Sequence, residues 1–306
     1  MAFQARPIYD WRLRTRSLAL GQRTLIMGIL NVTPDSFSDG GHFYDAASAQ
    51  ERAVEHALEL LDHGADLLDL GGESTRPGAT RLSPDEEQAR VLPVLEAILR
   101  ERPLAVVSID TFHAATARRA VEAGAEIVND VSGGLWDEAM LAAMAEIGSG
   151  AILMHTRGTP AEWKTLPALD AGAVMPLVMG GLEERLNAAI VAGVARDHIV
   201  LDPGLGFGKR LDENYPLLAN LSELHRLQRP ILVGASRKSF LAQTVAQAPS
   251  LAAVHEGAPP PVNARLNPTI AANVAAILAG AHILRVHDAQ PAAEAAAIAD
   301  RILSTK

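Results

Sequence analysis

No cysteine occurs among the 306 residues of this sequence, which excludes disulfide bonds and thiolate metal sites. The absence fits a reducing compartment, so we expect a cytoplasmic protein. Basic residues are also few: 27 Lys and Arg oppose 36 Asp and Glu, for a net charge of −9. This balance predicts no nucleic-acid partner. Apolar runs long enough to span a membrane are missing as well, and residues 1–16 lack the apolar centre of a signal peptide.

Apolar runs of strand length alternate with helical patterns along the sequence, and 48% of the residues are hydrophobic, enough for a large core. The predicted strands are residues 25–31, 66–72, 105–111, 127–131, 151–155, 199–202, 231–234 and 282–286. The predicted helices are residues 46–64, 114–123, 181–195, 214–227, 269–279 and 291–302, and one that opens at Ser83-Pro84-Asp85-Glu86. Continuous apolar strands indicate a parallel sheet covered on both faces. Eight short-linked units favour an α/β fold of the (β/α)8 TIM-barrel type over an open sheet.

One domain is expected over residues 1–306, with residues 1–24 as an N-terminal arm or hairpin that closes the lower mouth of the barrel. Arg12, Arg14 and Arg16 occupy alternate positions in this arm. They could bind phosphate, but a solvated hairpin that caps the fold explains them better. Residues 246–267 are expected to form a long mobile loop inside the domain.

Polar residues stand at or just after the ends of the predicted strands. They are Asn31, Asp69, Asp110, Asn129, Asp130, His155, Asp202, Ser236, Arg237, Lys238, Arg285 and His287. In a barrel of parallel strands these ends meet on one face, where the active site is built. Turns and helix caps could account for any one of these residues. They account poorly for the whole set, because eight successive strands would need the same coincidence.

Two of the strands lead into loops rich in glycine, proline and hydroxyl residues, which let a backbone approach a ligand closely. The first run is Leu25-Ile-Met-Gly-Ile-Leu-Asn-Val-Thr-Pro-Asp-Ser-Phe-Ser-Asp-Gly-Gly41, and the second is Asp66-Leu-Leu-Asp-Leu-Gly-Gly-Glu-Ser-Thr-Arg-Pro-Gly78. Residues 108–111, 129–134, 202–209, 236–239 and 285–288 complete the pattern. Together these segments resemble the dihydropteroate synthase family, and the resemblance covers nearly the whole chain from residue 25 onward.

The resemblance implies a transferase of folate biosynthesis that joins (7,8-dihydropterin-6-yl)methyl diphosphate to p-aminobenzoate and releases diphosphate. In that family the matching residues bind the pterin through Asp110, Asn129, Asp202 and Lys238. A carboxylate can accept two parallel N–H groups from the amidine-like edge of a pterin. The Lys238 ammonium would face the pterin carbonyl and ring nitrogen, although a solvated lysine at a helix start is the alternative.

An anion site is implied at the first and last strands. Arg285 and His287 flank one residue, so in a strand they share a face and could hold one diphosphate together. A salt bridge on the last strand is the alternative. Asn31 would bind Mg²⁺, which needs few protein atoms beside a substrate phosphate. Mg²⁺, Arg285 and His287 would then stabilise the departing diphosphate.

The family pattern also implies a second substrate site. The catalytic set would be Asp35, Lys238, Arg285 and His287, with Asp35 favouring positive charge on the pterin methylene group. The p-aminobenzoate site would use Phe37, Pro77, Lys238 and Ser239. Thr75 and Arg76 would bind substrate from the second loop, which also carries Pro77. No general base with a shifted pKa is required. A homodimer is expected through the alanine-rich last two helices, although packing within the chain would explain the alanines equally well.

Other interpretations fit less well. Gly204, Gly206 and Gly208 superficially suggest a dinucleotide loop, but they follow Asp-Pro and lack the βαβ context. His155 is interpreted as a packing or orienting residue. Neither a Ser-His-Asp pattern nor a zinc-ligand spacing is visible, which argues against acyl transfer and zinc hydrolysis.

Two related functions remain as alternatives. A methyltetrahydrofolate:corrinoid methyltransferase domain would need neither Arg285 and His287 nor the first loop. A pterin-binding paralogue without activity would be expected to have lost part of the first loop or Lys238. Two segments depart from the family pattern, at Thr156 and at residues 267–271. Neither is expected to touch the residues of the site.

Overall fold

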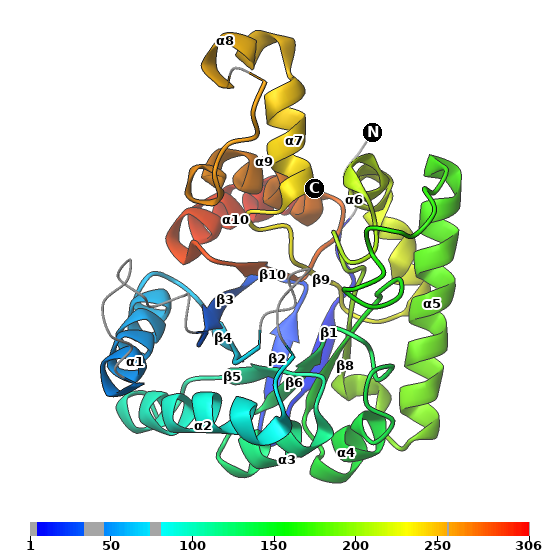
Figure 1. The fold of residues 1–306 in the computed structure, drawn as a ribbon. Helices are drawn as coiled ribbons and strands as arrows, with labels where there is room; N and C mark the ends of the chain where they lie inside the picture. Colours follow the sequence, from blue (N-terminus) through cyan, green and yellow to red (C-terminus); the bar gives the residue numbers. More distant parts are fainter. Residues whose placement is uncertain (1–4, 34–45, 74–80, 256, 306) are drawn as a thin grey trace.

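The computed structural model describes residues 5–33, 46–73, 81–255 and 257–305, and its centre is a barrel of parallel strands (Figure 1). The strands are β3 (Leu25–Asn31), β4 (Leu67–Gly71), β5 (Val107–Asp110), β6 (Ile127–Asp130), β7 (Gly150–Met154), β8 (Ile199–Asp202), β9 (Leu232–Val233) and β10 (Ile283–Val286). They lie in the order β8-β7-β6-β5-β4-β3-β10-β9. A parallel bridge between Leu201 and Ile231 links β8 to the start of β9 and completes the circle. The predicted (β/α)8 barrel is confirmed.

Helices surround the barrel (Figure 1). They are α1 (Ala46–Asp62), α2 (Pro84–Glu101), α3 (Ala114–Glu122), α4 (Met140–Ile147), α5 (Ala171–Val191), α6 (Tyr215–Ala219), α7 (Ser239–Gln247), α8 (Ala252–His255), α9 (Leu266–Leu278) and α10 (Ala289–Leu303). The predicted start of α2 is confirmed: Ser83 is the N-cap, Pro84 is the first helical residue, and Ser83 and Glu86 form a reciprocal capping box. In the described part of the chain, no helix is long and apolar enough to cross a membrane.

An antiparallel hairpin of β1 (Tyr9–Arg12) and β2 (Ser17–Leu20) closes the lower mouth of the barrel, as expected. Trp11 is fully buried among inward-facing strand residues, and its indole N–H donates to the His198 carbonyl at 2.7 Å. Arg14 donates to the Val121 carbonyl at 2.6 Å, and Arg16 to Leu104 at 3.0 Å. These arginines therefore attach the hairpin to the barrel, as the capping interpretation predicts.

Several helices differ from the sequence prediction. Helix α5 begins ten residues earlier than residue 181, because its first half, rich in apolar residues and glycine, has no polar face that would reveal a helical period. The helix predicted at 214–227 is broken into α6 and 3₁₀ turns at Leu211–Asn214 and Leu221–Leu227.

The chain also contains helices that were not predicted. Helices α4 and α7 are eight and nine residues long and have at most one charged residue each, so their sequences show no clear polar face. The segment expected to be a long loop contains α8 and the 3₁₀ turns Pro249–Leu251 and Val262–Ala264. The segment is thus a long connection with short helical turns, and its expected mobility stays a prediction.

Candidate active site

The carboxyl ends of the strands bring the predicted polar residues together on one face of the barrel. Strand register aligns Gly71 with Asp110 and Asp110 with Asn129. On the far side, Met154 aligns with Asp202. Parallel pairing of neighbouring strands thus brings together residues that lie 19 to 48 places apart in the sequence.

Arg285 lies at the centre of a charged network in this face. Its Nε donates to Asp69 Oδ2 and its Nη2 to Asp110 Oδ2, both at 2.5 Å. Asn129 Nδ2 donates to the same Asp69 oxygen at 2.9 Å. Burial opposes the charge of Arg285, but the two carboxylates outweigh burial and raise its pKa, so the guanidinium stays charged.

Asp110 is poised between its two protonation states. Burial raises the pKa of its carboxyl to about 7, and the Arg285 guanidinium only partly opposes this rise. Burial also raises the pKa of Asp202, whose Oδ1 accepts the Gly204 N–H at 2.7 Å. Burial thus disfavours the charged form of both carboxyls, and a ligand that brings N–H donors would offset this cost.

Lys238 is half-buried rather than solvated, so the alternative of a free lysine at a helix start does not hold. Its Nζ lies 4.2 Å from the centroid of the Phe207 ring. Burial lowers its pKa to about 8, against the opposing charge of Asp202. Phe207 packs against a buried cluster of Phe112, Val131 and Met154. An apolar surface therefore adjoins the cation and the carboxylates.

The glycine loop after β8 satisfies its own backbone. Asn214 Oδ1 accepts the Gly206 N–H at 2.7 Å, and Asp202 accepts that of Gly204. The buried Lys209 ammonium donates to the carbonyls of His155, Gly204 and Phe207 at 2.7–3.1 Å. These amides are occupied, and the 3₁₀ turn Leu211–Asn214 follows the glycines where a dinucleotide loop would open a helix. The loop therefore lacks the form of a dinucleotide site, and it places Phe207 beside Lys238.

The turn between β9 and α7 carries Lys238, and its Ser236 contacts His287, which follows β10. His287 Nδ1 lies 2.9 Å from Ser236 Oγ, and burial lowers its pKa to about 3, so the ring is neutral. Arg237 has a left-handed φ of 56°. Asp288 holds its guanidinium at 2.6 and 3.0 Å, and Thr269 Oγ1 accepts its N–H at 2.9 Å.

Thr269 corrects one expectation. It lies in the segment that departs from the family pattern, which was expected not to touch the site. Through Arg237 it supports the turn that carries Ser236 and Lys238. Thr156, the other departure, donates its hydroxyl to the Gly158 carbonyl of its own loop at 3.1 Å.

Five of the predicted site residues lie outside the described part of the chain: Asp35, Phe37, Thr75, Arg76 and Pro77. Asn31 ends β3, half-buried, and its Oδ1 lies beside Gly71, next to Asp110. Among the described residues, no group of three or more His, Cys, Asp and Glu could hold a metal ion. A single amide oxygen suits a cation held mainly by water and phosphate, but not a cation that needs a full protein cage.

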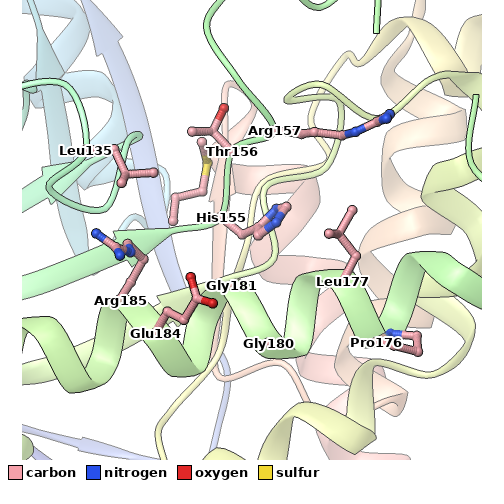
Figure 2. A pocket seen from close by; sticks show the side chains of 11 residues that line it. Leu135, His155, Thr156, Arg157, Pro176, Leu177, Gly180, Gly181, Glu184 and Arg185 are labelled. Carbon is pink, nitrogen blue, oxygen red and sulfur yellow. The ribbon is translucent and has the colours of Figure 1, made fainter. Parts of the chain in front are cut away.

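A cavity of about 400 Å³ lies beside this face, between the end of β7 and α5 (Figure 2). It is lined by Met154, His155, Arg157 and Arg185, among others, and by none of the strand-end carboxylates. His155 is 7% exposed, and burial lowers its pKa to about 3. Its ring packs against Gly181, where a Cβ would lie 2.5 Å from Cδ2. The interpretation of His155 as a packing residue is confirmed.

Sequence reasoning missed several partners of the site residues. Asp69 was noticed at a strand end but not assigned a role, although an aspartate between leucines in an apolar strand is a visible signal. Ser236 and Phe207 gave no signal of their contacts with His287 and Lys238, because these contacts join distant segments.

Known proteins resemble this chain over nearly its whole length. Residues 27–287 match the pterin binding enzyme family. The dihydropteroate synthase of Escherichia coli K12 is 41% identical over 92% of each chain. The Xanthomonas albilineans dihydropteroate synthase with 4-aminobenzoic acid is 37% identical, with a TM-score of 0.83 over 97% of this chain and all of that one. The same species' enzyme in complex with 7,8-dihydropteroate is 35% identical, with a TM-score of 0.78 over 94% and 97%.

Proposed function

The chain belongs to the pterin binding enzyme family, and we propose that it acts there as a dihydropteroate synthase. It is a transferase of folate synthesis that condenses (7,8-dihydropterin-6-yl)methyl diphosphate with p-aminobenzoate. The observation that carries this assignment is the group of Asp110, Asn129, Asp202, Lys238 and Arg285 at one face of the barrel, in a chain 41% identical to a known synthase.

The pterin ring binds between Asp110, Asn129, Asp202 and Lys238 in this proposal. The two carboxylates accept the ring's paired N–H groups, and Asn129 adds a neutral donor and acceptor. Lys238 donates to the pterin carbonyl, and the apolar surface at Phe207 and Met154 covers the ring. Support comes from the raised pKa values of both aspartates, since a site that disfavours bare carboxylate charge gains most from added donors.

The diphosphate binds at Arg285 and His287. Arg285 stays charged and offers its Nη groups, while the neutral His287 offers a ring N–H. Asn31 would hold a Mg²⁺ ion at the edge of this anion site. When bound, the ion would offset negative charge on the diphosphate.

The carbon–oxygen bond to the diphosphate breaks as the leaving group takes the electron pair. Arg285 and His287 stabilise the charge that gathers on it. The carboxylates near the ring favour the positive charge left on the methylene carbon, and Asp35 would join them. The p-aminobenzoate nitrogen then attacks and loses its proton. Ser239, exposed at the start of α7, would contact this substrate with Phe37, Pro77 and Lys238. Thr75 and Arg76 would bind substrate from the second loop.

The methyltransferase alternative is disfavoured by Arg285 and His287, which a corrinoid methyl transfer would not need. Loss of activity in a binding paralogue is disfavoured by the retained Lys238. We also propose a single domain over residues 1–306, a homodimer and a cytoplasmic location, which fits the cysteine-free composition.

A coupled assay tests the function. Purified protein should release pyrophosphate and form dihydropteroate from the dihydropterin diphosphate and p-aminobenzoate, and Mg²⁺ should be required. Lys238→Ala serves as the inactive comparison. Pterin binding without turnover in the unmodified protein would favour the binding paralogue, and methyl transfer from a folate would favour the alternative enzyme.

A further inference from the structure

Asp69 is a fully buried carboxylate in β4 that the ligand contacts proposed above leave unused. One of its oxygens, Oδ2, accepts from both Arg285 Nε and Asn129 Nδ2. The other, Oδ1, is buried and has no hydrogen-bond partner in the described part of the chain. A buried carboxylate is costly unless a counterion stays with it. Arg285 is the cation that pairs with it.

Arg285 holds two carboxylates through different ends of its guanidinium. Nε binds Asp69, and Nη2 binds Asp110. Asp110 is half-buried at the end of β5, whereas Asp69 lies two residues deeper, in the register position next to Ser108. The contact with Asp69 is thus the inner one, and the contact with Asp110 lies at the more exposed carboxylate, 16% against 0%.

We propose that Asp69 is a positioning residue that anchors Arg285 through Nε. When a pterin ring hydrogen-bonds to Asp110, it replaces Arg285 there, and the freed Nη groups of Arg285 bind the diphosphate. This inference rests on the proposed function. Pterin binding and anion binding should then be mutually favourable. A bound pterin hydrogen-bonds to Asp110 and breaks its contact with Arg285. An anion that binds afterwards finds the Nη groups of Arg285 already free, while Nε stays bonded to Asp69. Without Asp69, Arg285 would swing entirely to Asp110 and would compete with the ring.

Calorimetry of pyrophosphate binding with and without a bare, uncharged pterin tests the inference on the full chain. In the unmodified protein, the pterin should tighten pyrophosphate binding at least about fivefold, the lower end of usual coupling between sites. By linkage, pyrophosphate should tighten pterin binding by the same factor. Asp69→Asn, which keeps the shape and removes the charge, should abolish most of this gain.

Asp130→Asn is the matched control. Asp130 is also fully buried at a strand end, but among the described residues its carboxylate accepts from its own turn alone, at Ser132 and Gly134. It should keep the coupling even if it lowers the melting temperature as much as Asp69→Asn does. The Arg285 Nε–H resonance gives a second readout, because its shift should change in Asp69→Asn and persist in Asp130→Asn.

Retained coupling in Asp69→Asn, or absent coupling in the unmodified protein, would overturn the inference. Both results leave the proposed function intact if pterin and pyrophosphate each still bind. Failure of the proposed function looks different: the unmodified protein would bind no pterin, or Arg285→Lys would leave pyrophosphate binding unchanged.

Discussion

Burial shifts the pKa values of several single residues at this site away from their ordinary values. Asp110 is partly protonated near neutrality, His287 is neutral and Lys238 has a lowered pKa, all mainly because of burial. In each case burial removes the water that would otherwise hydrogen-bond to the charged form of the group. A pterin with N–H donors and a carbonyl acceptor restores these missing contacts, so ring recognition is the property that single substitutions should reveal first.

Asp202→Ala should weaken the binding of a bare pterin. The change removes a charge-assisted fork and leaves the ring donors unpaired, which costs about 1.5–3 kcal/mol, or roughly 10- to 150-fold in affinity. Isothermal titration with a pterin measures the loss. Asp212→Ala, which removes an exposed carboxylate in the 3₁₀ turn that follows the glycine loop, is the control and should bind normally. Unchanged affinity in Asp202→Ala would remove Asp202 from the pocket.

Pterin affinity should rise with pH through neutrality. The pKa of Asp110 is raised to about 7, so its carboxyl is mostly protonated below that pH and cannot accept both N–H groups. For such a group, affinity should be about tenfold weaker at pH 6 than at pH 8, with proton release on binding at pH 6. Titrations in buffers of different ionisation enthalpy measure that release. Asp110→Asn should bind weakly with a flatter profile; an unchanged slope in this variant would assign the proton to another group.

Arg285→Lys should separate the anion site from the ring site. The lysine keeps a charge but loses the Nε anchor and the fork, so pyrophosphate affinity should fall about tenfold while bare pterin binding changes little. His287→Ala should act in the same direction with a smaller effect. Equal losses for pyrophosphate and pterin in Arg285→Lys would mean that Arg285 supports the ring pocket rather than the anion site.

At the scale of elements, hydrogen bonds from neighbouring loops and helices hold the segments that carry the site residues. Lys209 ties the glycine loop to the loop after β7, and Thr269 at the start of α9 supports the turn before α7. Helix α5 contacts the ring of His155 through Gly181 (Figure 2). The same helix has a second glycine beside it, and the two face different surroundings.

Gly180→Ala and Gly181→Ala should shift stability in opposite directions. A Cβ on Gly180 would meet no described heavy atom within 4 Å, so the alanine should stabilise the helix by about 0.5–1 kcal/mol and raise the melting temperature. A Cβ on Gly181 would lie 2.5 Å from the buried His155 ring, so overpacking should cost about 1–3 kcal/mol and lower it. Calorimetric melting of both variants decides the matter; a gain in both would show that the His155 ring moves freely.

At the scale of the whole molecule, several alanines of the last two helices are buried by packing within the chain. Ala276 of α9 and Ala292, Ala296 and Ala299 of α10 are buried, which supports the packing explanation for them. Ile298 and Ile302 of α10 remain exposed, at 67% and 41%. The proposed homodimer therefore rests on this apolar edge rather than on the alanines.

A dimer mass is the expected result of light scattering at micromolar concentration. Ile298→Asp should shift the mass toward the monomer, because a charge would be buried in the interface. Val191→Asp, at a still more exposed apolar position on α5 (88%), is the control and should leave the mass unchanged. A monomer mass for the unmodified protein would refute the proposal.

Local pattern alone determined much of this protein. Continuous apolar strands, short connections and polar residues after each strand were enough to predict the barrel and the face of its site, because these signals depend on neighbours in sequence. The capping box at Ser83 and Glu86 is local in the same sense. Short or apolar helices such as α4 and the first half of α5 escaped prediction, since they have no clear period.

Only the tertiary structure decided which charges are partners. Arg285 and Asp69 are 216 residues apart, and no spacing rule connects them. Their pairing depends on the register of β10, β3 and β4 and on the depth of each residue in the barrel. The raised pKa of Asp110 likewise arises from burial, which is a property of the assembled mouth. Sequence thus specified the residues and the face, whereas packing specified their contacts and protonation, because burial and long-range pairing exist only in the folded chain.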